Sequence, residues 1–157
     1  MEEAPYHEFL LLSIENPMLD ISVTLTSEDL LEKYGLKMAN AVLATPQTMP
    51  IYDEIWNMPN RKTTPGGSSL NTVRAANFML KNRLRGKCGF FGCIGKDEFG
   101  RTVETELEKS GVHSLLYKTD EEKTASCAVL VYNNERSLCC NLAACLKYPT
   151  SHLKENL

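Results

Sequence analysis

The sequence predicts an α/β fold: a partial parallel, Rossmann-like sheet joined by crossover helices, with a small β lid beside it. Apolar strand patterns and helical patterns alternate between residues 66 and 117, an order typical of parallel strands with crossover helices. Two further strand patterns, at 125–132 and 136–142, follow with no helix after them. We expect this pair to be antiparallel and to lie beside the parallel sheet. The 157 residues suffice for about one domain with a core of its own.

The first 65 residues hold short elements that are interrupted by prolines. Asn16-Pro17 separates two strand patterns, and Thr26 or Ser27 can cap the helix that follows them. We expect strands at 9–14 and 20–25, a helix at 28–34, a strand at 41–44, a short helix at 51–56 and a strand near 62–64.

The elements after residue 65 are longer. A helix is expected to begin directly after Gly67 and to end near Gly86. Its inner face is expected to consist of Leu70, Val73, Asn77, Leu80 and Leu84. We then expect a buried strand at 87–94, a helix from about Phe99 to Gly111, a strand at 112–117, and the hairpin 125–142 with its turn at Asn133-Asn134-Glu135. The polar tail 147–157 is expected to fray.

The turn Pro65-Gly66-Gly67-Ser68 is a candidate ligand site. Two glycines let the backbone approach a ligand closely and adopt positive φ, and Ser68 or Ser69 can cap the helix. The free N–H groups of a helix N-terminus point at a polar or anionic ligand. The alternative is that this turn simply ends a strand.

Three polar side chains are candidates for ligand contacts. Asp20 lies near the end of a strand, just after a loop broken by proline, and can accept hydrogen bonds from a pair of hydroxyls, or it is a turn cap. Asn71 lies in the first turn of the glycine-headed helix and either faces the same cavity or caps the helix. Arg136 follows the hairpin turn and either reaches an anion or remains a solvated charge. The isolated histidines His7, His113 and His152 are given no role.

The six cysteines form no C-x-x-C and have no histidine at zinc-ligand spacing. We interpret them as buried reduced thiols, with redox-sensitive thiols in a ligand pocket as the alternative. The chain also lacks a G-x-x-x-x-G-K-[ST] phosphate loop, a G-x-S-x-G elbow and a metal-ligand cluster. No residue stands out as a general base.

Composition excludes several classes of partner. The net charge is only −3, which argues against a nucleic-acid or membrane-surface binder. No run approaches the about 18 apolar residues of a membrane span. The start Met1-Glu2-Glu3-Ala4-Pro5 is acidic where a signal peptide is basic. We therefore expect a cytoplasmic location, with the nucleus as an alternative that no basic cluster favours.

The order of motifs resembles the adenosine kinases, within the ribokinase-like family of carbohydrate kinases. The likeness covers nearly the whole chain, and the Asn-Pro-x-x-Asp and Asn-Leu-Ala-Ala blocks favour adenosine kinases over sugar kinases. The matching blocks are Asn16-Pro17-Met18-Leu19-Asp20-Ile21, Glu32-Lys33-Tyr34-Gly35-Leu36-Lys37, Gly66-Gly67-Ser68-Ser69-Leu70-Asn71, Phe90-Phe91-Gly92-Cys93-Ile94-Gly95, Asp97-Glu98-Phe99-Gly100, Arg136-Ser137-Leu138 and Asn141-Leu142-Ala143-Ala144.

The resemblance implies a ribokinase-like fold and an ATP- and Mg²⁺-dependent phosphorylation of adenosine at its 5′-hydroxyl, giving AMP. It implies adenosine as the small-molecule partner and a family that is usually monomeric. Residues 1–157 would be the N-terminal part of one ribokinase-like domain, with lid segments at about 20–65 and 120–142. The C-terminal half, which carries the catalytic aspartate and the ATP site in an Asp-x-x-Gly-Ala-Gly-Asp segment, is absent from this sequence.

The same resemblance assigns substrate contacts but no catalytic residue or metal ligand. Asp20 would hold the ribose 2′- and 3′-hydroxyls, Asn71 would hydrogen-bond the nucleoside, and Arg136 would help to neutralise the transferring phosphoryl group. The border of the nucleoside would be Asn16 with the backbone of Gly66, Gly67 and Ser68. The apolar wall for the adenine would be Leu43, Cys127, Leu138, Cys140 and Leu142.

Three residues depart from the family pattern. Glu15 stands where a glycine usually precedes Asn-Pro, and its side chain and charge are expected where backbone usually packs. Ala41 replaces a glutamine at the base of the lid, and Asn134-Glu135 replaces an acidic pair. Two alternatives to half of a kinase remain: a non-catalytic truncated product that binds nucleoside or a partner chain, and an incomplete gene model. An incomplete sheet would expose an apolar edge and face.

Overall fold

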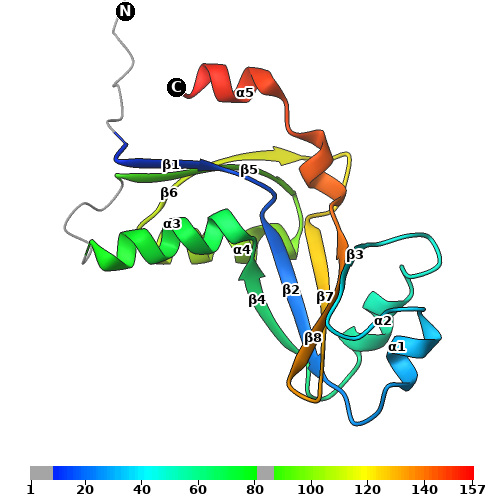
Figure 1. Cartoon of the computed structure of the whole chain (residues 1–157). Coiled ribbons are helices and arrows are strands. Elements are labelled where there is room, and N and C mark those ends of the chain that lie inside the picture. Colours follow the sequence, from blue (N-terminus) through cyan, green and yellow to red (C-terminus); the bar gives the residue numbers. More distant parts are fainter. Residues whose placement is uncertain (1–8, 81–86) are drawn as a thin grey trace, which may run out of the picture.

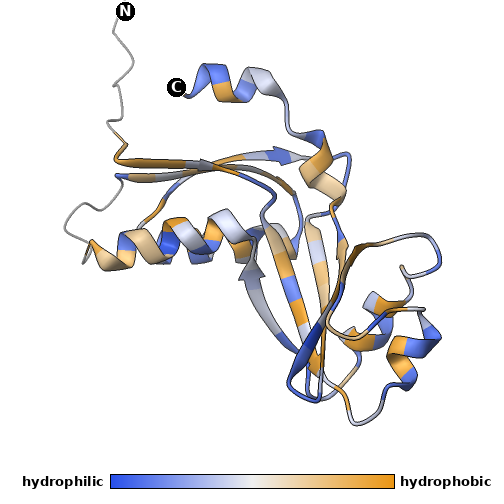
Figure 2. Cartoon of the chain, in the orientation of Figure 1, coloured by the Kyte–Doolittle hydropathy of each residue, from blue (hydrophilic) through white to orange (hydrophobic). Residues whose placement is uncertain are grey.

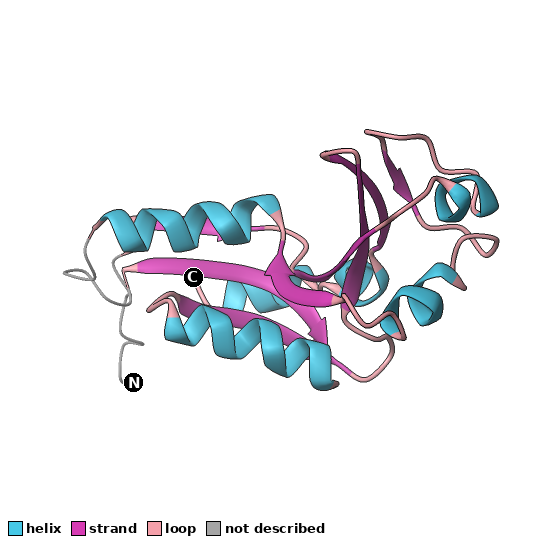
Figure 3. Ribbon diagram, turned by 90° about the horizontal axis from the view of Figure 1, so that it is seen from below, coloured by secondary structure: helices cyan, strands magenta, loops and turns pink. Residues whose placement is uncertain are grey.

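The computed structural model describes residues 9–80 and 87–157, which form two sheets whose strands run in different directions (Figure 1). The first sheet is parallel and has the order β1-β5-β6. Its strands are β1 (Leu11–Ile14), β5 (Cys88–Gly95) and β6 (His113–Thr119). Helices α3 (Ser68–Met79) and α4 (Glu98–Lys109) lie along one face of this sheet, as Figures 1 and 3 show. The expected parallel sheet with crossover helices is therefore confirmed.

Strand β5 is buried along its whole length because it lies between β1 and β6 and both of its faces are covered. Phe90 packs with α3 and α4 in one core cluster, together with Leu70 and Val103. On the other face, Phe91 contacts the His152 ring at a centroid distance of 6.2 Å. A continuous apolar run is the pattern that burial on both faces requires.

The second sheet has the order β3-β8-β7-β2-β4. Its strands are β2 (Met18–Thr24), β3 (Ala41–Leu43), β4 (Lys62–Gly66), β7 (Ala125–Tyr132) and β8 (Glu135–Asn141). β7 and β8 form the expected antiparallel hairpin, β2 runs parallel to β7, and β4 runs antiparallel to β2. The expected pairing of 125–142 is confirmed, but the hairpin adds to β2 rather than to the parallel sheet.

One face of the second sheet is packed against α1 (Asp29–Lys33) and α2 (Ile51–Trp56). Ile21, Ala128 and Cys139 point to this face and belong to its core cluster. Figure 2 shows the resulting alternation of hydrophobic and hydrophilic bands along β2. The alternate residues, including Asp20 and Cys127, belong to neither core cluster and point to the opposite face.

A buried polar cluster joins the two sheets where β5 ends, α4 begins and β7 begins. The Asp97 carboxylate accepts hydrogen bonds from the Gly100 N–H at 2.8 Å and from the Thr124 N–H at 2.8 Å. The Thr124 hydroxyl donates to the same carboxylate at 2.7 Å and accepts from the Gly95 N–H at 2.9 Å. Asp97 therefore caps α4 and fixes the start of β7 at the same time.

The C-terminal tail is ordered, and the expectation that it frays is wrong. It forms the 3₁₀-helix η1 (Ala143–Lys147) and α5 (Thr150–Glu155). His152 anchors α5 on the first sheet: its Nε2 lies 3.1 Å from the Leu115 carbonyl, and its ring packs edge-on against Tyr117 and Tyr148. These contacts hold the tail against the first sheet, although its polar composition gave no indication of packing.

Two further expectations concern the ends of elements. Helix α3 ends at Met79, and the rest of its expected span, with Leu84 and Gly86, lies outside the described residues. Strand β1 is an edge strand in the described part of the chain, and Leu12 and Ile14 on it are 37% and 53% exposed. An apolar edge is therefore exposed.

None of the helices within 9–80 and 87–157 has the length and apolar character needed to cross a membrane.

Candidate functional site

The strand register brings four of the predicted contact residues into one row across the second sheet. The paired positions are Leu43 with Cys140, Cys140 with Cys127, Cys127 with Asp20, and Asp20 with Thr64. Residues that are paired in register point to the same face of a sheet. The row therefore places a carboxylate, two thiols and a leucine side by side on the face opposite α1 and α2, which we call the open face.

Other predicted residues lie in the adjoining rows of the open face. Leu138 and Arg136 stand two and four positions before Cys140 on β8, so the two-residue period gives them the same orientation. Leu142 directly follows β8, and Gly66 ends β4 beside Met18. The structure thus gathers predicted residues from four segments that are far apart in the sequence.

Gly66 lies flush against the Asp20 carboxylate. A Cβ atom added at Gly66 would come within 3.0 Å of the carboxyl carbon and of both carboxyl oxygens. The next residue, Gly67, has φ of 115°, a conformation that side-chain-bearing residues rarely adopt. A Cβ on Gly67 would lie 3.0 Å from the Asn16 carbonyl oxygen. Both glycines are therefore required by space or by conformation, and they place bare backbone beside the carboxylate.

Glu15 occupies the N-terminus of α3. Its carboxylate accepts a hydrogen bond from the Ser68 hydroxyl at 2.5 Å and another from the Ser69 N–H. The Glu15 side chain and its charge were expected where backbone usually packs. In the structure they instead cap helix α3 from across the turn. Because an anion already occupies this helix end, the glycine turn suits a polar neutral ligand better than a phosphate. Asn71 lies exposed one turn further on.

Asp20 is half-buried, and its electrostatics follow from its position. Burial raises the pKa of its carboxyl group, and the positive charge of Arg136 on the same face partly offsets this effect. The folded chain therefore solvates the charge of this carboxylate less well than water does. Such a group is available to accept hydrogen bonds from a ligand.

We expect Asp20→Asn to make the ligand-free chain more stable at neutral pH. Folding raises the pKa of this carboxyl group. Such a group lowers the free energy of unfolding as the pH rises from the ordinary pKa of about 3.9 to the raised pKa, and the loss remains at higher pH. The asparagine variant avoids this loss. Urea unfolding at pH 7 should show a higher midpoint for the variant, and the difference should shrink toward pH 3.5. A midpoint at pH 7 that is equal to or below that of the natural chain would contradict this account.

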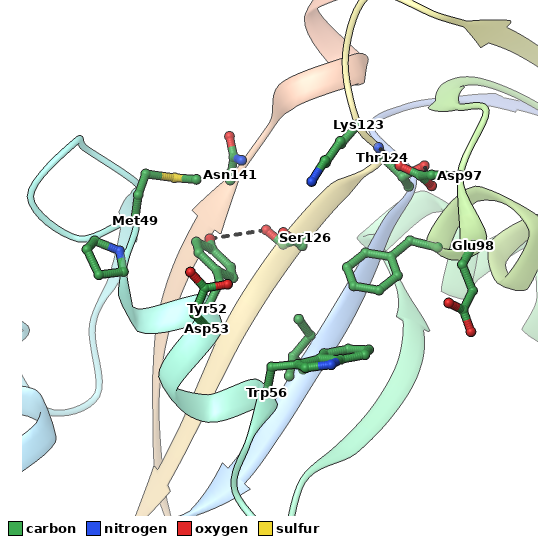
Figure 4. Close-up of a pocket in the computed structure, with 13 residues that line it drawn as sticks. Met49, Tyr52, Asp53, Trp56, Asp97, Glu98, Lys123, Thr124, Ser126 and Asn141 are labelled. Atoms are coloured by element: carbon green, nitrogen blue, oxygen red, sulfur yellow. Dashed lines mark hydrogen bonds between the residues drawn. The ribbon is translucent and has the colours of Figure 1, made fainter.

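A cavity lies on the other side of the second sheet. It has a volume of about 670 Å³ and is lined by side chains from α2, the start of α4 and the β7–β8 hairpin (Figure 4). Its residues are Ile21, Met49, Pro50, Tyr52, Asp53, Trp56, Asp97, Glu98, Phe99, Lys123, Thr124, Ser126 and Asn141. None of the predicted contact residues lines it. The sequence did not predict this cavity, because its walls come from segments that are far apart in the chain.

Trp56 forms part of the wall of this cavity and packs against two neighbouring side chains. The Trp56 ring packs on Phe99 at 5.2 Å between centroids, and the Arg61 guanidinium lies 3.9 Å from its centroid. Trp56 is therefore a packing residue that also forms a cavity wall. Figure 4 shows the amine of Lys123 directed into the cavity, while the Tyr52 hydroxyl donates a hydrogen bond of 2.7 Å to the Cys139 carbonyl.

The described residues form neither a cluster of metal ligands nor an open phosphate site at the N-terminus of a long helix. Within 9–80 and 87–157, no group of three or more His, Cys, Asp or Glu side chains is arranged to hold a metal ion. Acidic side chains also cap both long helices at their N-termini, Glu15 on α3 and Asp97 on α4, so neither end is open to a phosphate. The row of a carboxylate beside apolar side chains suits a polar neutral molecule with an apolar part.

Comparison with known proteins agrees with this arrangement. Residues 28–157 match the pfkB family of carbohydrate kinases. The chain is 35% identical over 155 residues to adenosine kinase 2 of Arabidopsis thaliana, covering 99% of this chain and 44% of that protein. It is 37% identical over 149 residues to the adenosine kinase of Schizosaccharomyces pombe, covering 94% of this chain and 42% of that protein. The chain thus spans less than half the length of these relatives.

Solved adenosine kinases have the same fold over the matched region. The Anopheles gambiae enzyme in complex with P1,P4-di(adenosine-5) tetraphosphate superposes with a TM-score of 0.87 at 38% identity, covering 93% of this chain and 45% of that one. The Schistosoma mansoni enzyme in complex with adenosine, in an occluded loop conformation, gives 0.86 at 30%, covering 92% and 41%. The chain therefore belongs to the pfkB family of carbohydrate kinases and has a ribokinase-like fold.

Proposed function

We propose that this chain is the nucleoside-binding half of an adenosine kinase. The complete enzyme transfers the γ-phosphate of ATP to the 5′-hydroxyl of adenosine and forms AMP. The observation that carries the proposal is the row of Asp20, Cys127, Cys140 and Leu43 across the open face. The relatives named above, which are adenosine kinases, support the choice of nucleoside.

The chemistry of the open face suits a nucleoside. A half-buried carboxylate can accept two hydrogen bonds from the vicinal hydroxyls of a ribose, and the bare backbone of Gly66 lets the carboxylate take this position. Leu138 and the half-buried Cys140 offer an apolar surface for a planar base, with the buried Cys127 beneath it in the same row. In this proposal Asn16, Gly67, Ser68 and Asn71 border the sugar, Leu142 extends the wall, and the exposed Arg136 approaches the phosphoryl group.

We further propose that the second sheet acts as a lid, formed from about residues 20–65 and 120–142. Lid closure would exclude water from the reacting groups. The base and the phosphate site would come from residues that this sequence does not contain, since it has no Gly-Ala-Gly-Asp segment. The exposed apolar edge of β1 supports an arrangement in which further strands continue the parallel sheet.

Calorimetry with adenosine tests the binding proposal. Asp20→Ala removes charge-assisted hydrogen bonds worth about 1.5–3 kcal/mol, so we expect the affinity for adenosine to fall about 10- to 100-fold. Asp53→Ala is the matched control, because Asp53 lines the cavity on the other side of the sheet, and its variant should bind as the natural chain does. Unchanged binding in Asp20→Ala, or loss of binding in Asp53→Ala, would place the nucleoside elsewhere.

An assay of AMP formation tests whether the chain is only half of an enzyme. We expect no turnover by the purified chain with ATP, Mg²⁺ and adenosine, because positioning and charge stabilisation around the phosphoryl group supply most of the rate. Turnover at the roughly 1–100 s⁻¹ typical of kinases would show that the chain is catalytically complete.

A further inference from the structure

We propose that Cys127 and Cys140 form a reversible disulfide that lowers the affinity of the open face for nucleoside. The proposal rests on the function proposed above for this face. It makes these two thiols, among the six cysteines of the chain, a modification site that responds to peroxide.

The position of the two cysteines in the hairpin carries the argument. Cys127 and Cys140 are directly opposite each other on the antiparallel strands β7 and β8. The Cys140 carbonyl accepts a hydrogen bond from the Ala44 N–H at 2.8 Å, and two residues earlier the Leu138 N–H donates to the Asn40 carbonyl at 2.8 Å. The backbone groups of these β8 residues therefore face the β3 side and not β7. It follows that Cys127 and Cys140 are a non-hydrogen-bonded pair.

A non-hydrogen-bonded pair brings two side chains closer than any other register in an antiparallel sheet. The Cα atoms in such pairs are about 4.5 Å apart, which lies within the range of about 4.4–6.8 Å that disulfides span. The two thiols are also close enough for each to shift the pKa of the other. A bond between the sulfurs therefore requires rotation of side chains but no rearrangement of the strands.

Access and reactivity distinguish Cys140 from the other thiols. Cys140 is half-buried, whereas the other five cysteines, Cys127 among them, are buried. The hydrogen bond from Cys127 lowers the pKa of Cys140, although burial and the charge of Asp20 act against this effect. The same pairing and burial raise the pKa of Cys127. Cys140 is thus the thiol that an oxidant in solution reaches and that ionises first.

The oxidation needs one molecule of hydrogen peroxide. The Cys140 thiolate attacks one peroxide oxygen, the O–O bond breaks, and a sulfenic acid forms with release of the first water. The Cys127 sulfur then attacks the sulfenic sulfur, the S–O bond breaks, and the second water leaves with the thiol proton. Two thiols lose two hydrogens, and one peroxide is reduced to two waters.

The disulfide would change the surface on which the nucleoside rests. Cys127 is the immediate neighbour of Asp20 in the row, and Cys140 is the neighbour of Leu43. Joining the sulfurs fixes both side chains between these two contacts and removes the surface that the base would cover. Bound nucleoside would in turn cover Cys140 and slow its oxidation, because two events that exclude each other at one site are linked.

The experiment treats the purified chain with hydrogen peroxide and maps disulfides by mass spectrometry of non-reduced peptides. We expect one dominant bond, between Cys127 and Cys140, and a fall of at least tenfold in adenosine affinity that a dithiol reductant reverses. Adenosine added before peroxide should slow formation of the bond. A dominant bond between other cysteines, or no bond at all, overturns the proposal.

Two variants make the test specific. Each is compared with itself before and after oxidation, so any change in its starting affinity does not matter. Cys140→Ala should bind adenosine equally well in both conditions. Cys139→Ala, the adjacent residue on the opposite face, should remain as sensitive as the natural chain. Sensitivity that persists in Cys140→Ala overturns the proposal.

The two proposals can fail separately. If the disulfide forms but the reduced chain has no affinity for adenosine, the proposed function and the effect on binding fall together, while the disulfide stands. If the reduced chain binds adenosine and no Cys127–Cys140 bond appears, this inference alone is rejected.

Discussion

Asp97→Ala is expected to lower the free energy of unfolding by about 3 kcal/mol. The substitution removes the cap of α4 and leaves the buried Thr124 N–H without its acceptor. A helix cap contributes about 1 kcal/mol, and a hydrogen bond to a charged group about 1.5–3 kcal/mol. Since domains of this kind are stable by only about 5–15 kcal/mol, this one side chain accounts for a large share. Urea unfolding followed by circular dichroism measures the loss.

Two control variants test whether the loss of stability comes from the polar cluster around Asp97 or from the removal of any negative charge. Asp97→Asn keeps one oxygen for the Gly100 N–H and should lose less than the alanine variant. Asp120→Ala removes an acid on the same side of the molecule whose ion pair with Lys96 is exposed, so it should cost no more than about 1 kcal/mol. Equal losses in Asp97→Ala and Asp120→Ala would show that the buried cluster is not what stabilises this junction.

The stability that Asp97 contributes is expected to decrease as the pH falls. Burial alone would raise the pKa of Asp97, but the hydrogen bonds from Gly100 and Thr124 outweigh burial and hold it below its ordinary value. Its stabilisation is therefore complete above the ordinary value of about 3.9 and is lost as the pH falls through the lowered value. The difference between the natural chain and Asp97→Ala should be full at pH 7 and should narrow below about pH 4.

Gly66→Ala is expected to reduce adenosine affinity by more than about 100-fold, which exceeds the effect of removing Asp20 itself. The added methyl group would collide with the carboxyl carbon and both oxygens of Asp20, so the carboxylate must leave its position while the methyl group fills the space beside it. Overpacking of this kind also costs about 1–3 kcal/mol of stability. Calorimetry measures the affinity and urea unfolding the stability.

Gly35→Ala provides the control for the backbone cost alone. Gly35 has φ of 63° with no atom within 4 Å of an added Cβ, so its variant loses about 1 kcal/mol through conformation without meeting any neighbour. It should bind adenosine as the natural chain does. If Gly66→Ala retains nucleoside binding, the contact between Gly66 and Asp20 does not shape the site.

The elements that the sequence predicted well are those with strong local patterns. β5 is a continuous apolar run with glycines, α4 begins at a capping aspartate and ends before Gly111, and the β7–β8 hairpin turns at two asparagines with positive φ. Each pattern is set by residues close together in the chain. These elements could therefore be predicted without knowledge of the tertiary contacts.

The features that sequence reasoning missed depend on contacts between distant segments. Helix α5 is held by His152 at the Leu115 carbonyl, and nothing near His152 in the sequence indicates that partner. The capping of α3 by Glu15 joins residues 53 and 54 positions apart. The cavity beside Trp56 likewise needs α4 and the hairpin to be placed first.

The candidate site was predicted by resemblance and not by spacing. Asp20 and Asn71 were visible as polar residues near element ends, but nothing in the spacing of Leu43, Cys127 and Cys140 indicates that they share a row. That information lies in the register of β2 with β7 and of β8 with β3. A shift of one residue in either register would turn these side chains to the opposite face.

The pairing of β2 with β7 also sets the order of events during synthesis. Asp20 leaves the ribosome before its neighbour Cys127 and the β8 strand beyond it, because a long stretch of chain separates them. Pairings between such distant segments form slowly, because a long loop must close before any contact is gained. The open face is therefore assembled late, and the nascent chain must hold β2 without its principal partner until the hairpin emerges.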